Sequence, residues 1–119
     1  MPLRVLIIDD DVDFLELMKR RLARRGFDVH TTQSPIGFTH LVYATQPDVV
    51  LIDVNLPAVS GTRLVQLARA KAGEDTRFYL LSQLDQSELD GLAREHECDG
   101  AFNKHTPLDR IVQVISGGG

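Results

Sequence analysis

Short apolar runs rich in β-branched residues recur along the chain and predict the strands of a buried sheet. The clearest runs are residues 3–8, 49–52 and 78–81. Each is bounded by proline or polar residues and is short for a helix, which favours a strand covered on both faces. Weaker runs at residues 27–31 and 101–103 predict two further strands.

The segments between these runs carry the spacing of amphipathic helices. In residues 12–25, apolar side chains recur every three or four positions, and Gly26 provides a C-terminal stop. A second helix is predicted from the Ser34-Pro35 cap to about residue 45, and a third over residues 61–71. A fourth is predicted from Asp85, with Glu88 completing a capping box, to about residue 97. The last helix is predicted from Pro107 onward.

Strand and helix alternate five times, which predicts an α/β fold. Because crossover connections between parallel strands are right-handed, this order makes a doubly wound parallel sheet with helices on both faces. A length of 119 residues suits one domain. We expect that domain to span residues 1–116, with 117–119 as a flexible tail that could begin a linker to an effector.

Composition narrows the function classes. The net charge of −4 and pI near 5.4 argue against a nucleic-acid-binding surface over the whole domain. The basic run of residues 19–25 is predicted to be a solvated helix face. Cys98 is the lone cysteine and is expected to be a buried filler in a reducing compartment. No membrane span or signal-peptide pattern is evident, so we expect a cytoplasmic protein.

Polar residues follow the predicted strands at one edge of the sheet. They are Asp9, Asp10 and Asp11 after the first strand, Asp53 after the third, Ser82 after the fourth and Lys104 after the fifth. In a doubly wound sheet, ligands bind at the carboxyl ends of the strands. Asp11 or Asp13 could simply cap the following helix, since aspartate is a preferred N-cap.

Several carboxylates in one crevice repel one another and need a cation or protons. Oxygen ligands favour a hard ion such as Mg²⁺, which retains waters and binds phosphate. Lys104 and the Ser82 hydroxyl would balance and orient an anion on Asp53. The combination predicts a phosphoryl-transfer site.

Four segments resemble the receiver domain of bacterial two-component response regulators: VLIIDDD (5–11), QPDVVLIDVNLPAVSG (46–61), YLLS (79–82) and DGAFNK (99–104). The resemblance implies the flavodoxin-like (βα)5 receiver fold with strand order 2-1-3-4-5. It also implies a phosphoacceptor domain in a phosphorelay that catalyses its own phosphorylation and dephosphorylation but is not a turnover enzyme.

Roles follow from the resemblance position by position. Asp53 corresponds to the phosphoacceptor, and the metal ligands would be Asp9, Asp10, Asp53 and the carbonyl of Asn55. Ser82 corresponds to the switch hydroxyl and Lys104 to the lysine that pairs with the phosphoryl group. The implied partners are a histidine kinase or phosphotransfer protein and a downstream effector or linked output domain, with a homodimer as a further option. Direct nucleic-acid binding and membrane binding are not expected.

Three positions depart from the family pattern. Gln83 stands where a small residue usually follows the switch hydroxyl, and Ala101 stands where an aromatic residue usually lies. Phe102 is predicted to pack in the core, because neighbouring strand residues face opposite sides. His105 replaces a proline after the lysine, so we expect a trans peptide there and an exposed histidine.

Two alternatives remain beside the phosphorylated switch. The departures at Gln83, Ala101 and His105 suggest a receiver-shaped interaction module whose output does not depend on phosphorylation. An aspartate-nucleophile phosphatase of similar architecture would need an acidic residue two places after the nucleophile. Asn55 occupies that position and cannot deliver a proton, which disfavours the phosphatase.

Overall fold

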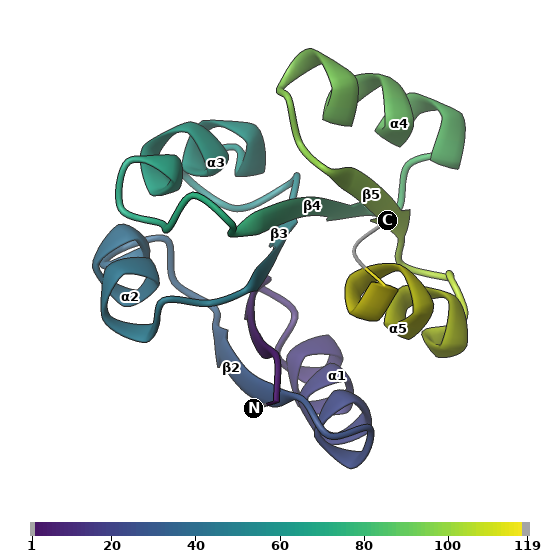
Figure 1. Cartoon of the computed structure of the whole chain (residues 1–119). Coiled ribbons are helices and arrows are strands. Elements are labelled where there is room, and N and C mark those ends of the chain that lie inside the picture. Colours follow the sequence, from purple (N-terminus) through teal and green to yellow (C-terminus); the bar gives the residue numbers. More distant parts are fainter. Residues whose placement is uncertain (1, 118–119) are drawn as a thin grey trace.

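The computed structural model describes residues 2–117. Over these residues five strands alternate with five helices (Figure 1). The elements are β1 (Arg4–Ile8), α1 (Val12–Arg24), β2 (Asp28–Thr32), α2 (Phe38–Thr45), β3 (Val49–Asp53), α3 (Gly61–Arg69), β4 (Arg77–Ser82), α4 (Gln86–Glu95), β5 (Gly100–Asn103) and α5 (Leu108–Gly117).

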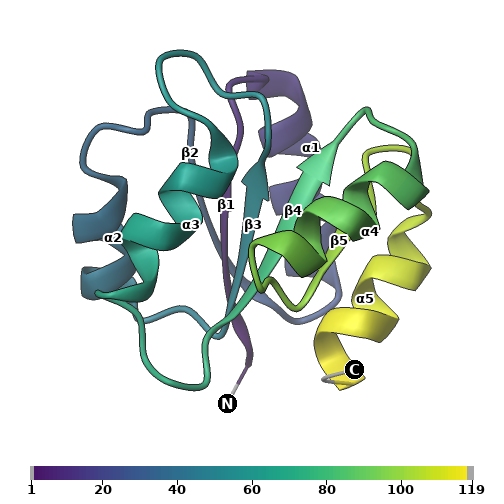
Figure 2. The same ribbon diagram turned by 90° about the horizontal axis from the view of Figure 1, so that it is seen from above.

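The strands form one parallel sheet in the order β2-β1-β3-β4-β5, as predicted. Helices α2, α3 and α4 cover one face, and α1 and α5 cover the other (Figures 1 and 2). Pairing of Ile8 with Ile52 places the ends of β1 and β3 side by side, and pairing of Asp53 with Leu81 adds the end of β4. The residues that follow these three strands therefore meet at one edge.

Alternate residues of each central strand enter two separate cores. Leu6, Val50 and Leu80 pack beneath α2, α3 and α4, whereas their neighbours Ile7 and Leu51 pack beneath α1 and α5. All five residues are fully buried. Burial on both faces explains why the sequence of β1 and β3 is a continuous apolar run rather than an alternating one.

Both ends of α1 match the sequence prediction. Asp11 is the N-cap, and its Oδ1 accepts a hydrogen bond from the Phe14 amide at 3.1 Å. At the other end, Gly26 has a φ of +91°, and its amide donates to the Ala23 carbonyl while the Phe27 amide donates to Leu22. This pair of bonds is a Schellman motif, which favours glycine at its left-handed position.

One predicted helix start is wrong, and one predicted capping box is absent. Ser34 Oγ accepts a bond from the Ile36 amide within a turn, and α2 begins only at Phe38, after Gly37 in a left-handed conformation. Asp85 does stand at the N-cap of α4, but its side chain makes no capping bond, so the predicted capping box is absent. A local side-chain turn replaced the expected cap in the first case.

The last helix includes Gly117, the first residue of the predicted tail. Residues 118–119, the rest of that tail, lie outside the described part of the chain, and the domain boundary stays a prediction. Pro107 lies before α5 rather than in its first turn, and its carbonyl accepts bonds from Arg110 and Ile111. In residues 2–117, no helix combines the length and the apolar character needed to cross a membrane.

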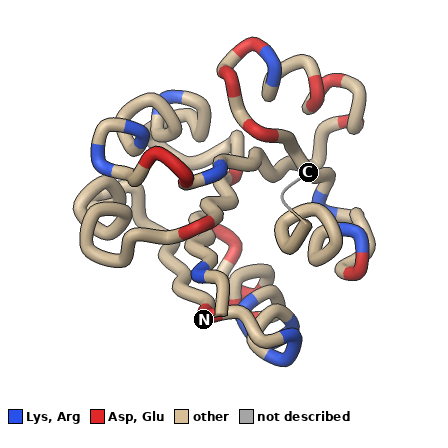
Figure 3. The backbone as a smooth tube through the Cα atoms, in the orientation of Figure 1, with Lys and Arg blue, Asp and Glu red and all other residues tan. Residues whose placement is uncertain are grey.

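The basic run of α1 is exposed, as predicted. Its members are Lys19, Arg20, Arg21, Arg24 and Arg25, and they gather toward the C-terminal end of the helix (Figure 3). Arg25 forms an ion pair with Asp109 of α5. Exposed pairs of this kind contribute little to stability, so the run acts mainly as a solvated surface.

The start of α3 is in direct contact with the end of β3. A Cβ built on Gly61 would lie 2.1 Å from the Asp53 carbonyl oxygen and 2.9 Å from the Val54 Cα. The Gly61 amide donates to the Val54 carbonyl at 3.0 Å. Because these neighbours are backbone atoms, a side chain at position 61 would displace either the helix or the strand end.

We expect Gly61→Ala to lower the free energy of unfolding by about 1–3 kcal/mol, because backbone must shift to admit the methyl group. Urea unfolding measures this change. The matched control is Gly91→Ala in α4, where the nearest atom to a new Cβ is 4.0 Å away at the end of the Arg94 side chain. That control should be stabilised by up to about 1 kcal/mol. A Gly61→Ala protein as stable as wild type would contradict the packing argument.

Candidate functional site

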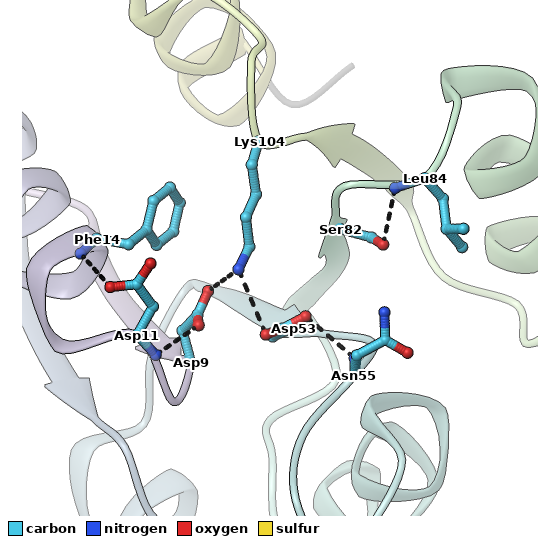
Figure 4. A network of polar contacts seen from close by, with 8 residues as sticks. All are labelled: Asp9, Asp11, Phe14, Asp53, Asn55, Ser82, Leu84 and Lys104. Atoms are coloured by element: carbon cyan, nitrogen blue, oxygen red, sulfur yellow. Dashed lines mark hydrogen bonds and ion pairs between the residues drawn. The ribbon is translucent and has the colours of Figure 1, made fainter.

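Four strands deliver polar side chains to one crevice at the carboxyl edge of the sheet (Figure 4). Asp9 follows β1 and is 0% exposed, while Asp53 ends β3 and is 4% exposed. Ser82 ends β4 and is buried. Lys104 follows β5, and its amide donates to the Ser82 carbonyl at 2.9 Å. The sheet thus brings together the strand-end residues that the sequence singled out.

Lys104 bridges the two buried carboxylates. Its Nζ lies 2.6 Å from Asp9 Oδ2 and 3.4 Å from Asp53 Oδ2, and the side chain is 11% exposed. The same ammonium lies 4.9 Å from the centroid of the Phe14 ring, in the range of a cation–π contact. Phe14 belongs to the first turn of α1, so that helix supports the lysine from the side opposite Asp53.

Backbone amides fix the other oxygen of each carboxylate. Asp9 Oδ1 accepts a bond from the Asp11 amide at 2.9 Å, and Asp53 Oδ1 accepts one from the Asn55 amide at 3.1 Å. Each carboxylate therefore directs one oxygen at its own loop and the other at Lys104. Charge-assisted bonds of this kind hold the side chains in a defined orientation.

The acidic cluster offers the oxygen ligands that a hard cation prefers. Carboxylate oxygens of Asp9, Asp10 and Asp53 lie within 4.8 Å of one another. Asp9 Oδ2 is buried and has no hydrogen-bond donor of good geometry among the described residues, although the Lys104 ammonium is close. Oxygen ligands and an incompletely satisfied carboxylate fit a divalent cation such as Mg²⁺. Asp10, which is exposed, would be the ligand nearest solvent.

Burial and charge shift two pKa values in the crevice. Burial raises the pKa of Asp9 above its ordinary value, and the charge of Asp53 adds to the rise, against the opposing effect of Lys104. Burial alone would lower the pKa of Lys104, but its bond to Asp9 and the charges of Asp53 and Asp9 outweigh that effect and raise it. The lysine is therefore firmly charged, and its charge offsets part of the cost of burying Asp9.

The Ser82 hydroxyl makes its hydrogen bond outside the cluster of carboxylates and Lys104. Its Oγ accepts a hydrogen bond from the Leu84 amide at 3.1 Å, and within residues 2–117 no hydrogen bond joins Ser82 to Asp53. Asp11 caps α1 and takes no part in the three-carboxylate cluster. The charged groups of the crevice are thus Asp9, Asp10, Asp53 and Lys104, with Ser82 beside them at the end of β4.

Phe102 and His105 lie as predicted. Phe102 is buried and stacks on Tyr79 with ring centroids 5.3 Å apart, beside the small Ala101. Gln83 and His105 are exposed. Within residues 2–117 no peptide bond is cis, which agrees with the trans bond expected before His105.

Sequence reasoning missed three residues near the site. Phe14 belongs to the apolar positions of the helix predicted over residues 12–25, yet its ring also supports Lys104. Gln86 and Asn103 form a polar network beside Ser82. The position of Phe14, three residues after the Asp11 N-cap, could have indicated that its ring lies near the ends of the strands. The network had none, because it depends on how α4 approaches β5.

The sequence is similar to known proteins. The model of the response regulator receiver domain family matches residues 5–116. Protein RcaC of Microchaete diplosiphon is 39% identical over 70 residues, covering 59% of this chain and 11% of that protein. Response regulator MprA of Mycobacterium sp. (strain KMS) is 31% identical over 85 residues, covering 71% of this chain and 36% of that protein.

A solved structure shows the same architecture. A response regulator receiver domain (CheY-like) from Methylobacillus flagellatus superimposes with a TM-score of 0.82 at 28% identity, covering 97% of this chain and 99% of that one. The chain matches between about a tenth and a third of the length of the two curated relatives named above.

Removal of the lysine charge should expose the repulsion between the carboxylates. We expect Lys104→Met to lower the free energy of unfolding by about 3 kcal/mol at pH 7.5 without divalent cations, since the buried carboxylates lose their partner. Because the folded pKa of Asp9 is raised, the folded state takes up a proton as pH falls, so the loss should be smaller at pH 5. Denaturant unfolding at both pH values measures this difference.

The control is Lys71→Met at an exposed position, where the change should stay within about 0.5 kcal/mol at either pH. A Lys104→Met protein with wild-type stability at pH 7.5, or one less stable at pH 5 than at pH 7.5 relative to wild type, would contradict the electrostatic account.

Proposed function

The chain belongs to the family of response regulator receiver domains, the signal-receiving modules of two-component systems, and from this premise we propose that Asp53 is its phosphoacceptor. The observation that supports the proposal is the geometry of one buried carboxylate. Asp53 lies 3.4 Å from the Lys104 ammonium and shares a cluster with Asp9 and Asp10. Such a group, held beside fixed positive charge, is suited to accept and stabilise a phosphoryl group.

The donor in this proposal is a phosphohistidine of a histidine kinase or phosphotransfer protein. An oxygen of Asp53 attacks phosphorus while the P–N bond of the donor breaks, and the imidazole nitrogen retains the electron pair. Lys104 stays charged throughout and offers its ammonium to a phosphoryl oxygen. The transferred group carries more negative charge than the carboxylate it joins. The attraction between the Lys104 ammonium and the phosphoryl oxygen therefore strengthens as transfer proceeds.

The metal site of the proposal consists of Asp9, Asp10 and Asp53, with the backbone carbonyl of Asn55 as a further ligand. Bound Mg²⁺ would neutralise phosphoryl charge during transfer. Before the metal binds, Lys104 is the partner of Asp9 Oδ2 at 2.6 Å. We therefore expect metal binding to free the ammonium from Asp9, which leaves it available for Asp53 and its phosphoryl group.

Ser82 supplies the conformational response. Its hydroxyl would turn to donate to a phosphoryl oxygen on Asp53, and its contact with the Leu84 amide would then be lost. The domain would also catalyse loss of the phosphoryl group to water, which resets the switch without making it a turnover enzyme. A downstream effector or linked output domain, or a second copy of the chain, would read the change. We place this activity in the cytoplasm.

A second function, a docking module with phosphorylation-independent output, is favoured by one observation. Ala101 carries no ring, and Phe102 is committed to its stack on Tyr79, so the sheet has no aromatic group at position 101 to move with Ser82. In this alternative, partner affinity would be equal for wild type and for Asp53→Asn. An unequal affinity would exclude it.

Beryllofluoride tests the primary proposal, because it imitates a phosphoryl group on a carboxylate. We expect it to bind with millimolar Mg²⁺ and to shift the backbone amide resonances of Asp53, Ser82 and Lys104. The shifts should vanish in Asp53→Ala. Failure to shift these amides in wild type, or persistence of the shifts in Asp53→Ala, would overturn the assignment of Asp53.

Mg²⁺ alone tests the metal ligands. A cation that binds only the folded state adds about 2.7 kcal/mol to the free energy of unfolding at a hundred times its dissociation constant. We expect this gain in wild type, and we expect Asp10→Asn to weaken Mg²⁺ affinity by about tenfold or more, because a ligand is lost. Asp13→Asn, an exposed change in the first turn of α1, is the matched control and should bind as wild type does. Equal affinity in all three proteins would contradict the proposed ligand set.

A further inference from the structure

The side-chain amide of Gln86 occupies the outer edge of β5. Its Nε2 donates to the Ala101 carbonyl at 2.9 Å, and its Oε1 accepts from the Asn103 amide at 3.1 Å. A third contact, from Nε2 to Asp90 Oδ1 at 2.9 Å, orients the amide within α4. Gln86 is the first residue of α4, so the two bonds to β5 attach the start of that helix to the last strand of the sheet.

These two bonds imitate the pairing of a parallel strand. The Lys104 amide donates to β4, so the polar backbone groups of Ala101 and Asn103 point away from the sheet. In a parallel ladder, one residue donates to a carbonyl and accepts from the amide two residues later. Gln86 makes both contacts with one side chain and satisfies groups that edge strands otherwise leave free.

The same region is connected to Ser82 through two hydrogen bonds. Ser82 Oγ accepts from the Leu84 amide at 3.1 Å, and the Leu84 carbonyl accepts from Asn103 Nδ2 at 2.7 Å. Asn103 Oδ1 in turn accepts from the His105 amide at 2.8 Å. Asn103 therefore connects the loop after β4, the edge of β5 and the loop that carries Lys104.

We propose that Ser82, Leu84, Asn103 and Gln86 form a latch that reports the state of Asp53 to the outer edge of β5. The proposal rests on the phosphorylation of Asp53 proposed above. When the Ser82 hydroxyl turns to the phosphoryl group, the Leu84 amide loses its acceptor and the loop of residues 83–85 is less restrained. Asn103 loses a fixed partner in the Leu84 carbonyl, and Gln86 releases β5.

The latch is suited to release. Gln86 is exposed, so water can replace its bonds, and the loss of one such hydrogen bond is a modest change. Ala101 and Gln86 also line a cavity of about 350 Å³ on this side of the sheet, bordered by Asp90 and Arg110. Release would therefore transfer the Ala101 carbonyl and the Asn103 amide from Gln86 to solvent beside this cavity, which changes the surface that α4 and β5 present.

Amide hydrogen exchange tests the link without any phosphate analogue. In metal-free protein, Ser82→Ala removes the acceptor of the Leu84 amide, and we expect the Asn103 amide to exchange about fivefold faster than in wild type. Gln86→Ala should accelerate the same amide at least as much. Gln83→Ala is the matched control, since the side chain of that exposed neighbour makes no hydrogen bond within residues 2–117. Wild-type exchange of Asn103 in Ser82→Ala would overturn the latch.

Beryllofluoride with Mg²⁺ separates this proposal from the phosphoacceptor proposal. We expect wild type to show shifted amides at Asp53 and Lys104, faster exchange at Asn103 and a changed Gln86 side-chain resonance. Shifts at Asp53 with no change at Asn103 or Gln86 would overturn the latch and leave the phosphoacceptor standing. If beryllofluoride has no effect but Ser82→Ala still accelerates Asn103, the phosphoacceptor proposal fails while the physical link is supported.

Discussion

Two buried carboxylates that share a single ammonium are the constraint on which the site depends. Asp9 and Asp53 are held next to each other because β1 and β3 are neighbours in the sheet, and Lys104 at the end of β5 supplies the positive charge between them. Desolvation makes such a cluster unfavourable unless its geometry is well fixed. The Asp11 and Asn55 amides and the Phe14 ring provide that fixation, which is why loops and a helix, as well as strands, must be in place around the crevice.

The sequence predicted most of the fold and most of the crevice, because both follow from regular periodicity. Strands buried on both faces appear as apolar runs, and the residue after each run must lie at the carboxyl edge, so Asp9, Asp53, Ser82 and Lys104 could be located in advance. The errors came where short polar side chains had two possible local partners. Ser34 bonds within a turn instead of capping a helix, and Asp85 occupies a cap position without making the cap bond. Gln86 was not predictable, since its partners are backbone groups fifteen and seventeen residues away.

The crevice and the proposed latch differ in the side chains that build them. The crevice is built from charged side chains at the ends of β1, β3 and β5. The proposed latch uses neutral amides and a hydroxyl, and Ala101 contributes only its backbone carbonyl. Neutral, partly solvated bonds are individually weak. A latch of this type would respond to small movements of the Ser82 hydroxyl, because no bulky side chain has to be repacked.

The bare backbone of Gly61 has a mechanical consequence. With no side chain between them, the first residue of α3 and the peptide that follows Asp53 have no clearance, since even a methyl group would overlap the Asp53 carbonyl. Because the two segments touch through backbone atoms, a displacement of the Asp53 peptide would also displace the start of α3. The exposed positions of α3 could therefore be redesigned without changing this contact between the helix and the end of β3.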